Sequence, residues 1–171
     1  MAQDEAITRL ARQIDATQRA ERFLVDADQI AELRRKAACE LHRVSAEFVS
    51  SVNGKLSEAV LDLSPATYSP EVFRDSEVNL IQISSQGRQM QIAFKAIPQL
   101  VSTEKFAIPY VLEGEVRTYN QRMLERLEVR SLSIFFCVEE KTATWRFFDW
   151  RTRGTGAVDL GLLVNLMEPL F

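Results

Sequence analysis

The fold class is decided by residues 125–150, ERLEVRSLSIFFCVEEKTATWRFFDW. The middle of this stretch, SLSIFFCV at 131–138, alternates between apolar residues and residues of mixed character, which is the period-two pattern of a strand with one apolar face. A second aromatic strand is expected at 143–150, after the polar break at 139–141. Together they predict the most hydrophobic β-hairpin of the chain and the centre of a sheet.

The apolar phase changes within this stretch. Leu127 and Val129 are odd-numbered, whereas the later apolar residues, from Leu132 on, are even-numbered. One extra residue turns every later side chain to the other face of a strand, so we expect a β-bulge near Arg130 or Ser131. Residues 121–128 can also be read as a helical turn.

Three further strands are expected upstream, at 78–84, 88–97 and 110–118. The first two form a hairpin through Ser85-Gln86-Gly87, and polar residues alternate with apolar ones in the second. Helices precede these strands and one helix follows them. This order predicts an α+β fold with a mostly antiparallel sheet of five or six strands.

The first third of the chain has helical periodicity. Apolar residues recur every three or four positions in 4–25 and again in 30–52. Asp26 followed by Gln29 fits a capping box between the two stripes, so the segment is one bent helix or a helical hairpin. We expect the second helix to stop at Asn53-Gly54, with the glycine left-handed, and a short helix to follow within 56–63.

The last helix is expected after Asp159, which can cap it, and before Pro169. Its residues 160–167 are apolar nearly all round, so it should be buried on more than one side. Residues 151–156 read as a glycine-containing turn. We divide the chain into a helical arm (1–63), an irregular connection (64–76) and an antiparallel sheet with its C-terminal helix (77–171), forming one folding unit.

Composition is that of an ordinary globular protein. The 171 residues are 46% hydrophobic and 26% charged, with a formal net charge of −3 and two distant cysteines. This balance gives no global attraction for nucleic acid, and it predicts no disulfide framework. There is no secretory signal, and no apolar run reaches the roughly 20 residues that cross a bilayer. We therefore expect a cytoplasmic protein without a membrane span.

A nucleic-acid interface is one alternative, because aromatic and basic residues gather near the end of the sheet. Stacking rings and guanidinium groups are what single-strand binders use. The residues that could contact nucleic acid or another ligand are Trp145, Arg146, Arg151 and Arg153. Because side chains alternate along a strand, the rings are divided between two faces of the sheet. Packing in the core of the sheet accounts for them more simply than a nucleic-acid site does. We do not expect nucleic acid as the partner.

Chemical sites are weakly supported. Cys39 and His42 lie one helical turn apart, but two ligands do not make a metal site. Residues 139–141, Glu-Glu-Lys, have the residue types of a metal-dependent nuclease site, which would need a further carboxylate from Asp62, Asp75 or Glu113. Residues 154–156, Gly-Thr-Gly, lack the spacing of a dinucleotide loop. We predict no catalytic residue, no metal ligand and no cofactor.

A non-enzymatic protein-interaction module is the function we expect: an adaptor, chaperone or regulatory subunit that forms a homodimer or binds another protein. Its N-terminal apolar stripe must be buried on the sheet or on a second copy. By periodicity, the contact residues are Leu33, Ala37, Leu41, Val44 and Phe48. The alternative is a small-ligand-binding or hydrolytic domain with a pocket between helices and sheet, lined by Glu113, Arg117, Arg130 and Arg146.

Overall fold

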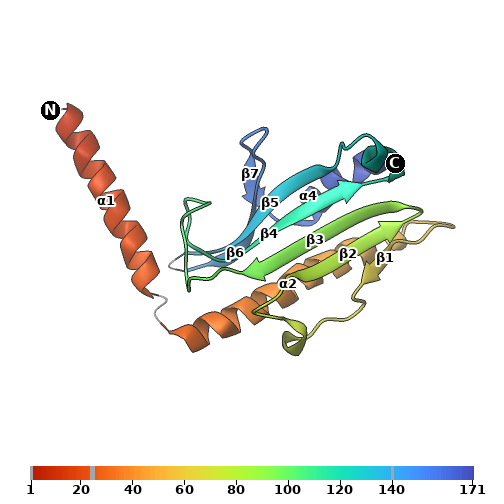
Figure 1. Ribbon diagram of the computed structural model, residues 1–171, viewed down its shortest axis with the longest axis horizontal. Helices are drawn as coiled ribbons and strands as arrows, with labels where there is room; N and C mark the ends of the chain where they lie inside the picture. The colour runs from red at the N-terminus through yellow and green to blue at the C-terminus, as the bar shows by residue number, and fades with distance from the viewer. Residues whose placement is uncertain (1, 24–25, 140) are drawn as a thin grey trace.

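The computed structural model describes residues 2–23, 26–139 and 141–171, and it confirms an α+β fold with N-terminal helices, an antiparallel sheet and a C-terminal helix (Figure 1). The helices are α1 (Ala2–Phe23), α2 (Ala27–Asn53), α3 (Gln121–Glu125) and α4 (Leu160–Met167), with 3-10 turns η1 (Pro70–Val72) and η2 (Glu168–Leu170). The strands are β1 (Asp62–Ser64), β2 (Asn79–Ser85), β3 (Arg88–Ala96), β4 (Tyr110–Tyr119), β5 (Arg130–Val138), β6 (Ala143–Phe148) and β7 (Thr155–Ala157).

The sheet is a meander in which each strand pairs antiparallel with the next, in the order β1 to β7. Local chemistry explains the tight connections. Gln86 and Gly87 both have positive φ, 50° and 76°, as a two-residue hairpin turn between twisted strands requires. The sequence predicted five or six strands, and the described residues form seven. The hairpin of β5 and β6 lies towards the β7 edge, so the prediction that it forms the centre of the sheet is wrong.

The predicted bulge near Arg130 or Ser131 is also wrong. β5 begins at Arg130, and the odd-numbered apolar residues precede it in a turn, where Leu127 has φ 55° and is 91% exposed. The alternative prediction, a helical turn within 121–128, agrees better with the structure, because α3 forms here. Asn120 caps α3 by accepting from the Met123 amide. The register between β4 and β5 shifts instead between Tyr110 and Leu112.

Helix boundaries follow the caps with two exceptions. The Asp26 side chain caps α2, and the Asp159 side chain caps α4, each by accepting from an amide of the first turn. The stop at Asn53 is confirmed, but Gly54 has φ −62°, so its predicted left-handed conformation is wrong. Residues 56–61 form no helix. How α1 and α2 join lies outside the described residues, since the link includes 24 and 25.

The core lies between one face of the sheet and α2, with α4 beside α2. Strand alternation turns the apolar residues towards this helix, among them Ile81, Ile92, Leu112, Ile134 and Trp145, all at most 3% exposed. A smaller apolar cluster, Ile97, Tyr110, Phe135 and Cys137, lies apart from it, where Phe106 and Ile108 of the 98–109 segment pack. On the rest of the face opposite α2, the strands carry polar and charged side chains such as Gln91, Glu115 and Arg117.

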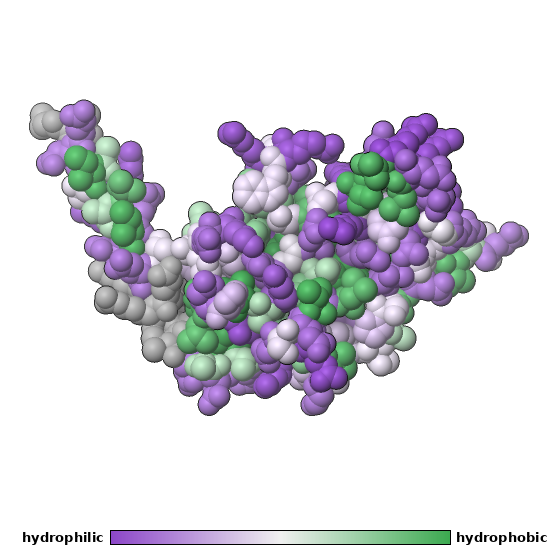
Figure 2. Space-filling view, viewed as in Figure 1, coloured by the Kyte–Doolittle hydropathy of each residue, from purple (hydrophilic) through white to green (hydrophobic). Residues whose placement is uncertain are grey.

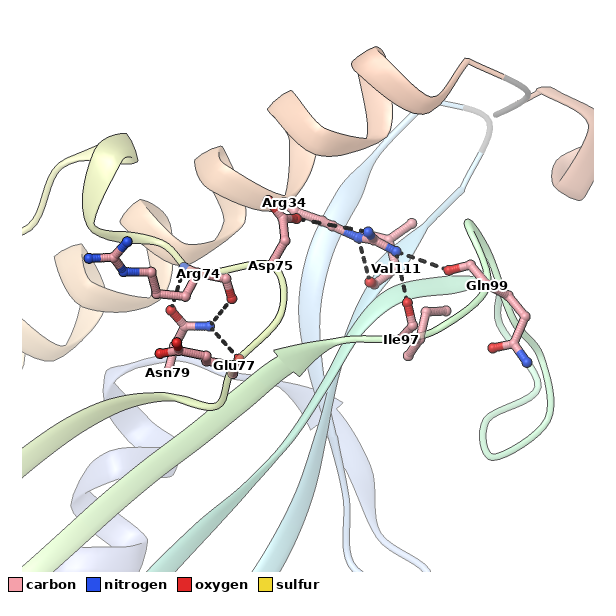
Figure 3. A network of polar contacts seen from close by, with 8 residues as sticks. All are labelled: Arg34, Arg74, Asp75, Glu77, Asn79, Ile97, Gln99 and Val111. Carbon is pink, nitrogen blue, oxygen red and sulfur yellow. Dashed lines mark hydrogen bonds and ion pairs between the residues drawn. The ribbon is translucent and has the colours of Figure 1, made fainter.

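A buried arginine fixes α2 to the end of the sheet (Figure 3). Arg34 is 9% exposed and donates to the carbonyl oxygens of Val111 at 3.1 Å, Ile97 at 3.3 Å and Gln99 at 3.0 Å. Burial lowers the pKa of its guanidinium, and the Asp75 carboxylate, 4.0 Å away, opposes that shift. Arginine stays charged in proteins, and its fork of donors can serve several carbonyls at once.

Arg34→Met should lower the free energy of unfolding by about 2–4 kcal/mol, because three carbonyl oxygens then lose a charged donor. Arg34→Lys should recover part of that loss, since one ammonium cannot reach all three acceptors. Arg35→Met is the matched control, because the neighbouring Arg35 is exposed. Urea unfolding followed by circular dichroism measures all three. An equal loss in Arg34→Met and Arg35→Met would contradict the role of this network.

Candidate functional site

The predicted contact stripe of α2 lies in the core of its own chain. Ala37, Leu41 and Phe48 are at most 3% exposed, and Leu33 and Val44 pack partly buried against the same cluster. A second protein could reach these side chains only if α2 left the sheet. The interaction prediction itself stays a prediction, but this stripe is not a free surface.

The aromatic and basic residues near the end of the sheet are divided by the strand. Trp145 is 3% exposed, and its ring nitrogen donates to the Ala37 carbonyl of α2 at 2.8 Å. Arg146 lies on the opposite face of β6, where its Nε atom is buried without a partner among the described residues. Arg151 and Arg153 are exposed in the turn before β7. Trp145 therefore cannot stack on a base while it packs against α2.

Cys39 and His42 face the segment that follows β1. The His42 ring lies 5.3 Å from the Tyr68 ring and shares a hydrogen bond of 2.7 Å with the Pro65 carbonyl oxygen. Burial raises the pKa of Tyr68 to about 12, and its hydroxyl has no hydrogen-bond partner among the described residues. Within the described part of the chain, no three His, Cys, Asp or Glu residues are grouped so as to hold a metal ion.

The remaining polar candidates are only partly brought together. Glu113, Arg117 and Arg146 share the sheet face opposite α2. Arg130 pairs with buried Thr118, so its position in the strand belongs to the face that α2 covers. The Glu139–Lys141 turn includes residue 140, which lies outside the described residues. Part of the predicted 154–156 loop is strand β7, which pairs with β6, and a Cβ atom at Gly156 would come within 3.1 Å of the Phe147 ring.

An exposed apolar stripe lies on α1. Ile7, Leu10 and Ile14 are 65%, 56% and 51% exposed, and their spacing places them on one side of the helix. The helix stands away from the sheet (Figure 1), and hydrophobic side chains gather along it in the space-filling view (Figure 2). In proteins most of the stability of a helix comes from packing its apolar face, and the exposed stripe of α1 lacks such packing.

An apolar groove lies at the other end of α2. Its volume is about 250 Å³, and it is bordered by α2, the loop before β1, α4 and the C-terminal residue. The lining residues are Phe48, Val52, Leu56, Ala59, Leu61, Ser85, Val164, Met167, Glu168 and Phe171. Three of them, Leu56, Val164 and Phe171, are 41–68% exposed. We call this surface the α2–α4 groove.

A second hollow, of about 360 Å³, lies on the sheet face opposite α2. It is formed by β3, β4 and β5 together with Val78 and with Lys105 of the 98–109 segment. The core lies between α2 and the sheet, and this hollow is on the other face of the sheet. Of the four polar residues predicted to line a pocket, Glu113 lines this one.

Sequence reasoning missed the groove, and it did not single out the exposed stripe of α1. The stripes of α1 and α2 have the same helical spacing, so periodicity alone could not tell which one the sheet covers. The signal that could have told the two helices apart was the length of the apolar stripe, since the stripe of α2 continues to the end of its helix. The groove joins residues more than a hundred positions apart, and no local pattern reports such a contact.

The two tryptophans offer a test of how the strand divides the aromatic residues. Trp150→Phe leaves only buried Trp145, whose emission should be blue-shifted and protected from iodide quenching. Trp145→Phe leaves only Trp150, 65% exposed, whose emission should be quenched readily. Trp145→Phe should also cost about 1–2 kcal/mol of stability, against about 0.5 kcal/mol or less for Trp150→Phe. Equal quenching in the two variants would contradict this arrangement.

Cys137 should make the protein less stable in alkali. Burial raises the pKa of its thiol to about 12 from an ordinary value of 9.0; nearby Arg146 lowers it and Glu139 raises it. Between these values only the unfolded chain loses the proton, so the free energy of unfolding should fall by about 1 kcal/mol per pH unit above pH 9. Tyr68 adds a similar loss at higher pH. Urea unfolding from pH 7.5 to 10.5 should show a shallower fall in Cys137→Ala, and an unchanged slope would contradict this assignment.

Comparisons with known proteins found no relative of this chain. Neither a family model, nor a curated protein, nor a solved structure matches the chain. Among the described residues, the structure has no helix with the length and apolar character that a bilayer span requires. What the protein does must therefore be inferred from its own surfaces.

Proposed function

We propose that the protein is a self-associating interaction module in which α1 of one copy packs into the α2–α4 groove of a second copy. The observation that carries the proposal is the exposure of 51–65% at Ile7, Leu10 and Ile14. Burying such residues stabilises an assembly by about 25 cal/mol per Å² of apolar surface removed from water. The groove supplies apolar surface of the same kind, and its most exposed apolar residue is Phe171 at 68%.

Helix geometry favours a second copy over the chain's own groove. At 1.5 Å per residue, the stripe extends only about 24 Å from the end of α1, at Ile7, whereas the groove begins about 32 Å along α2, at Phe48. The link from Phe23 to Ala27 spans four Cα–Cα steps and adds about 14 Å at most. Ile14, about 14 Å from the end of α1, therefore falls short of the groove when α1 folds back along its own α2.

Symmetry favours two contacts over one. A specific interface buries about 1,200–2,000 Å² in total, more than three side chains on a single helix can provide. In a two-fold dimer each copy would contribute one α1 and one groove, so the same contact would form twice. Placing the two α2 helices antiparallel brings the start of one near the end of the other. This arrangement is self-complementary and closes without leaving a free α1.

Ile14→Glu should weaken the dimer by about tenfold or more, because it places a charge in an apolar contact. Ala16→Glu is the matched control, since Ala16 is exposed on the opposite side of the same helix and the new side chain is identical. Sedimentation equilibrium over a range of protein concentrations measures the dissociation constant of each. Val164→Glu tests the groove in the same way, because Val164 is 44% exposed at its rim.

Three results would overturn the proposal. The wild-type chain could remain monomeric at high micromolar concentration, Ala16→Glu could weaken association as much as Ile14→Glu, or Val164→Glu could leave it unchanged. The last result, with Ile14→Glu still weakening the dimer, would mean that α1 pairs elsewhere than in the groove. Circular dichroism of each variant distinguishes a lost contact from a lost fold.

A further inference from the structure

The hollow on the sheet face opposite α2 supports an inference independent of self-association. Its volume of about 360 Å³ lies within the range of small-molecule sites, about 300–1,000 Å³. Ala93 and Phe135 come from β3 and β5, and Val78 lies just before β2, so part of the lining is apolar. The Phe135 ring is held in place by stacking on Phe106 of the 98–109 segment, with centroids 4.9 Å apart.

Two ammonium groups meet one carboxylate at this hollow. The Glu113 side chain is 13% exposed, and the Nζ atom of Lys105 lies 3.0 and 3.2 Å from its two carboxylate oxygens. The Nζ atom of Lys95 is 3.8 Å away, so it makes an ion pair without a close hydrogen bond. The two lysine side chains are 54% and 57% exposed. This trio leaves one positive charge in excess, with lysine donors still open to solvent.

The other charged residue of the lining does not reverse that excess. The Glu115 carboxylate accepts from Arg117 Nε at 3.1 Å and from the Ser131 hydroxyl, so its charge is already met. The Ser133 hydroxyl accepts from Trp150 Nε1 at 2.8 Å, which leaves its own proton to donate. The hydrogen bond to Glu113 raises the pKa of Lys105, so this lysine remains protonated above neutral pH.

We propose that this hollow binds a small organic monocarboxylate with an apolar body. The carboxylate would meet Lys95, Lys105 and the Ser133 hydroxyl, and the body would lie on Val78 and Ala93, over the Phe135 ring, which is itself only 3% exposed. One excess charge suits a monoanion. No arginine lines the hollow among the described residues, so a phosphate would lack the bidentate fork that usually holds it. A neutral ligand would leave the lysines without a new partner.

The test is a titration of the ¹⁵N-labelled 171-residue chain followed by two-dimensional NMR. 3-Phenylpropanoate should shift the amides of Ala93, Gly114 and Ser133 in a saturable way, at high micromolar to millimolar concentration. The amide analogue 3-phenylpropanamide keeps the apolar body without the charge and should bind at least about fivefold more weakly. Inorganic phosphate supplies charge without the body and should give no saturable shift at these amides.

Variants locate the site. Lys95→Gln should weaken 3-phenylpropanoate binding by about fivefold, because it removes one of two ammonium groups without removing the Lys105–Glu113 contact. Ala93→Leu should abolish binding by filling the hollow. Lys36→Gln, at an exposed position of α2, removes the same charge far from the site and should change nothing. The binding should also persist in Ile14→Glu, whether or not the chain dimerises.

Several outcomes would overturn this assignment. They are the absence of saturable shifts at the hollow, equal binding of the amide analogue, tighter binding of phosphate than of the carboxylate, or equal effects of Lys95→Gln and Lys36→Gln. If Ala93→Leu unfolds the protein, Lys95→Gln still decides the result, because its side chain is half-exposed and outside the core.

Discussion

The contact between Arg34 and three carbonyl oxygens is the constraint on which the rest of the structure depends. Two of its acceptors, Ile97 and Gln99, lie just after β3, and the third, Val111, lies in β4 near the register shift. One side chain therefore fixes the position of α2 relative to two neighbouring strands. The Trp145 bond to the Ala37 carbonyl ties the next turn of the same helix to β6. The helix is thus held across the width of the sheet.

Fixing α2 in this way decides which surfaces remain for function. The helix covers one face of the sheet, and it uses its whole apolar stripe to do so. The opposite face carries Lys95, Glu113, Glu115 and Arg117 on its central strands, so it cannot bury a second amphipathic helix without desolvating several charges. The apolar stripe of α1 is therefore left uncovered by its own sheet, while the hollow among those charges stays accessible to a small molecule.

Much of the fold could be predicted because its signals are local. Strand alternation, helical spacing and the caps Asp26 and Asp159 each depend on residues a few positions apart. β1 and β7 were missed because three residues are too few to show alternation, and pairing with a neighbour defines them. Arg34 was overlooked although it lies on the apolar stripe of α2, four residues after Ile30 and three before Ala37. A charged residue in that position was the sign of a buried network.

The surfaces proposed for function were the hardest to foresee, and the reason is physical. A side chain is exposed when no distant segment covers it, so exposure depends on long-range contacts that a local pattern does not contain. Ile14 of α1 and Leu41 of α2 belong to similar stripes, yet they are 51% and 1% exposed. The core face of the sheet is occupied by α2 with α4 beside it, and the longer stripe of α2 buries more apolar surface there than the stripe of α1 could. The shorter stripe of α1 is then the one left for a partner, and this competition is why the same spacing produces core in one helix and a contact surface in the other.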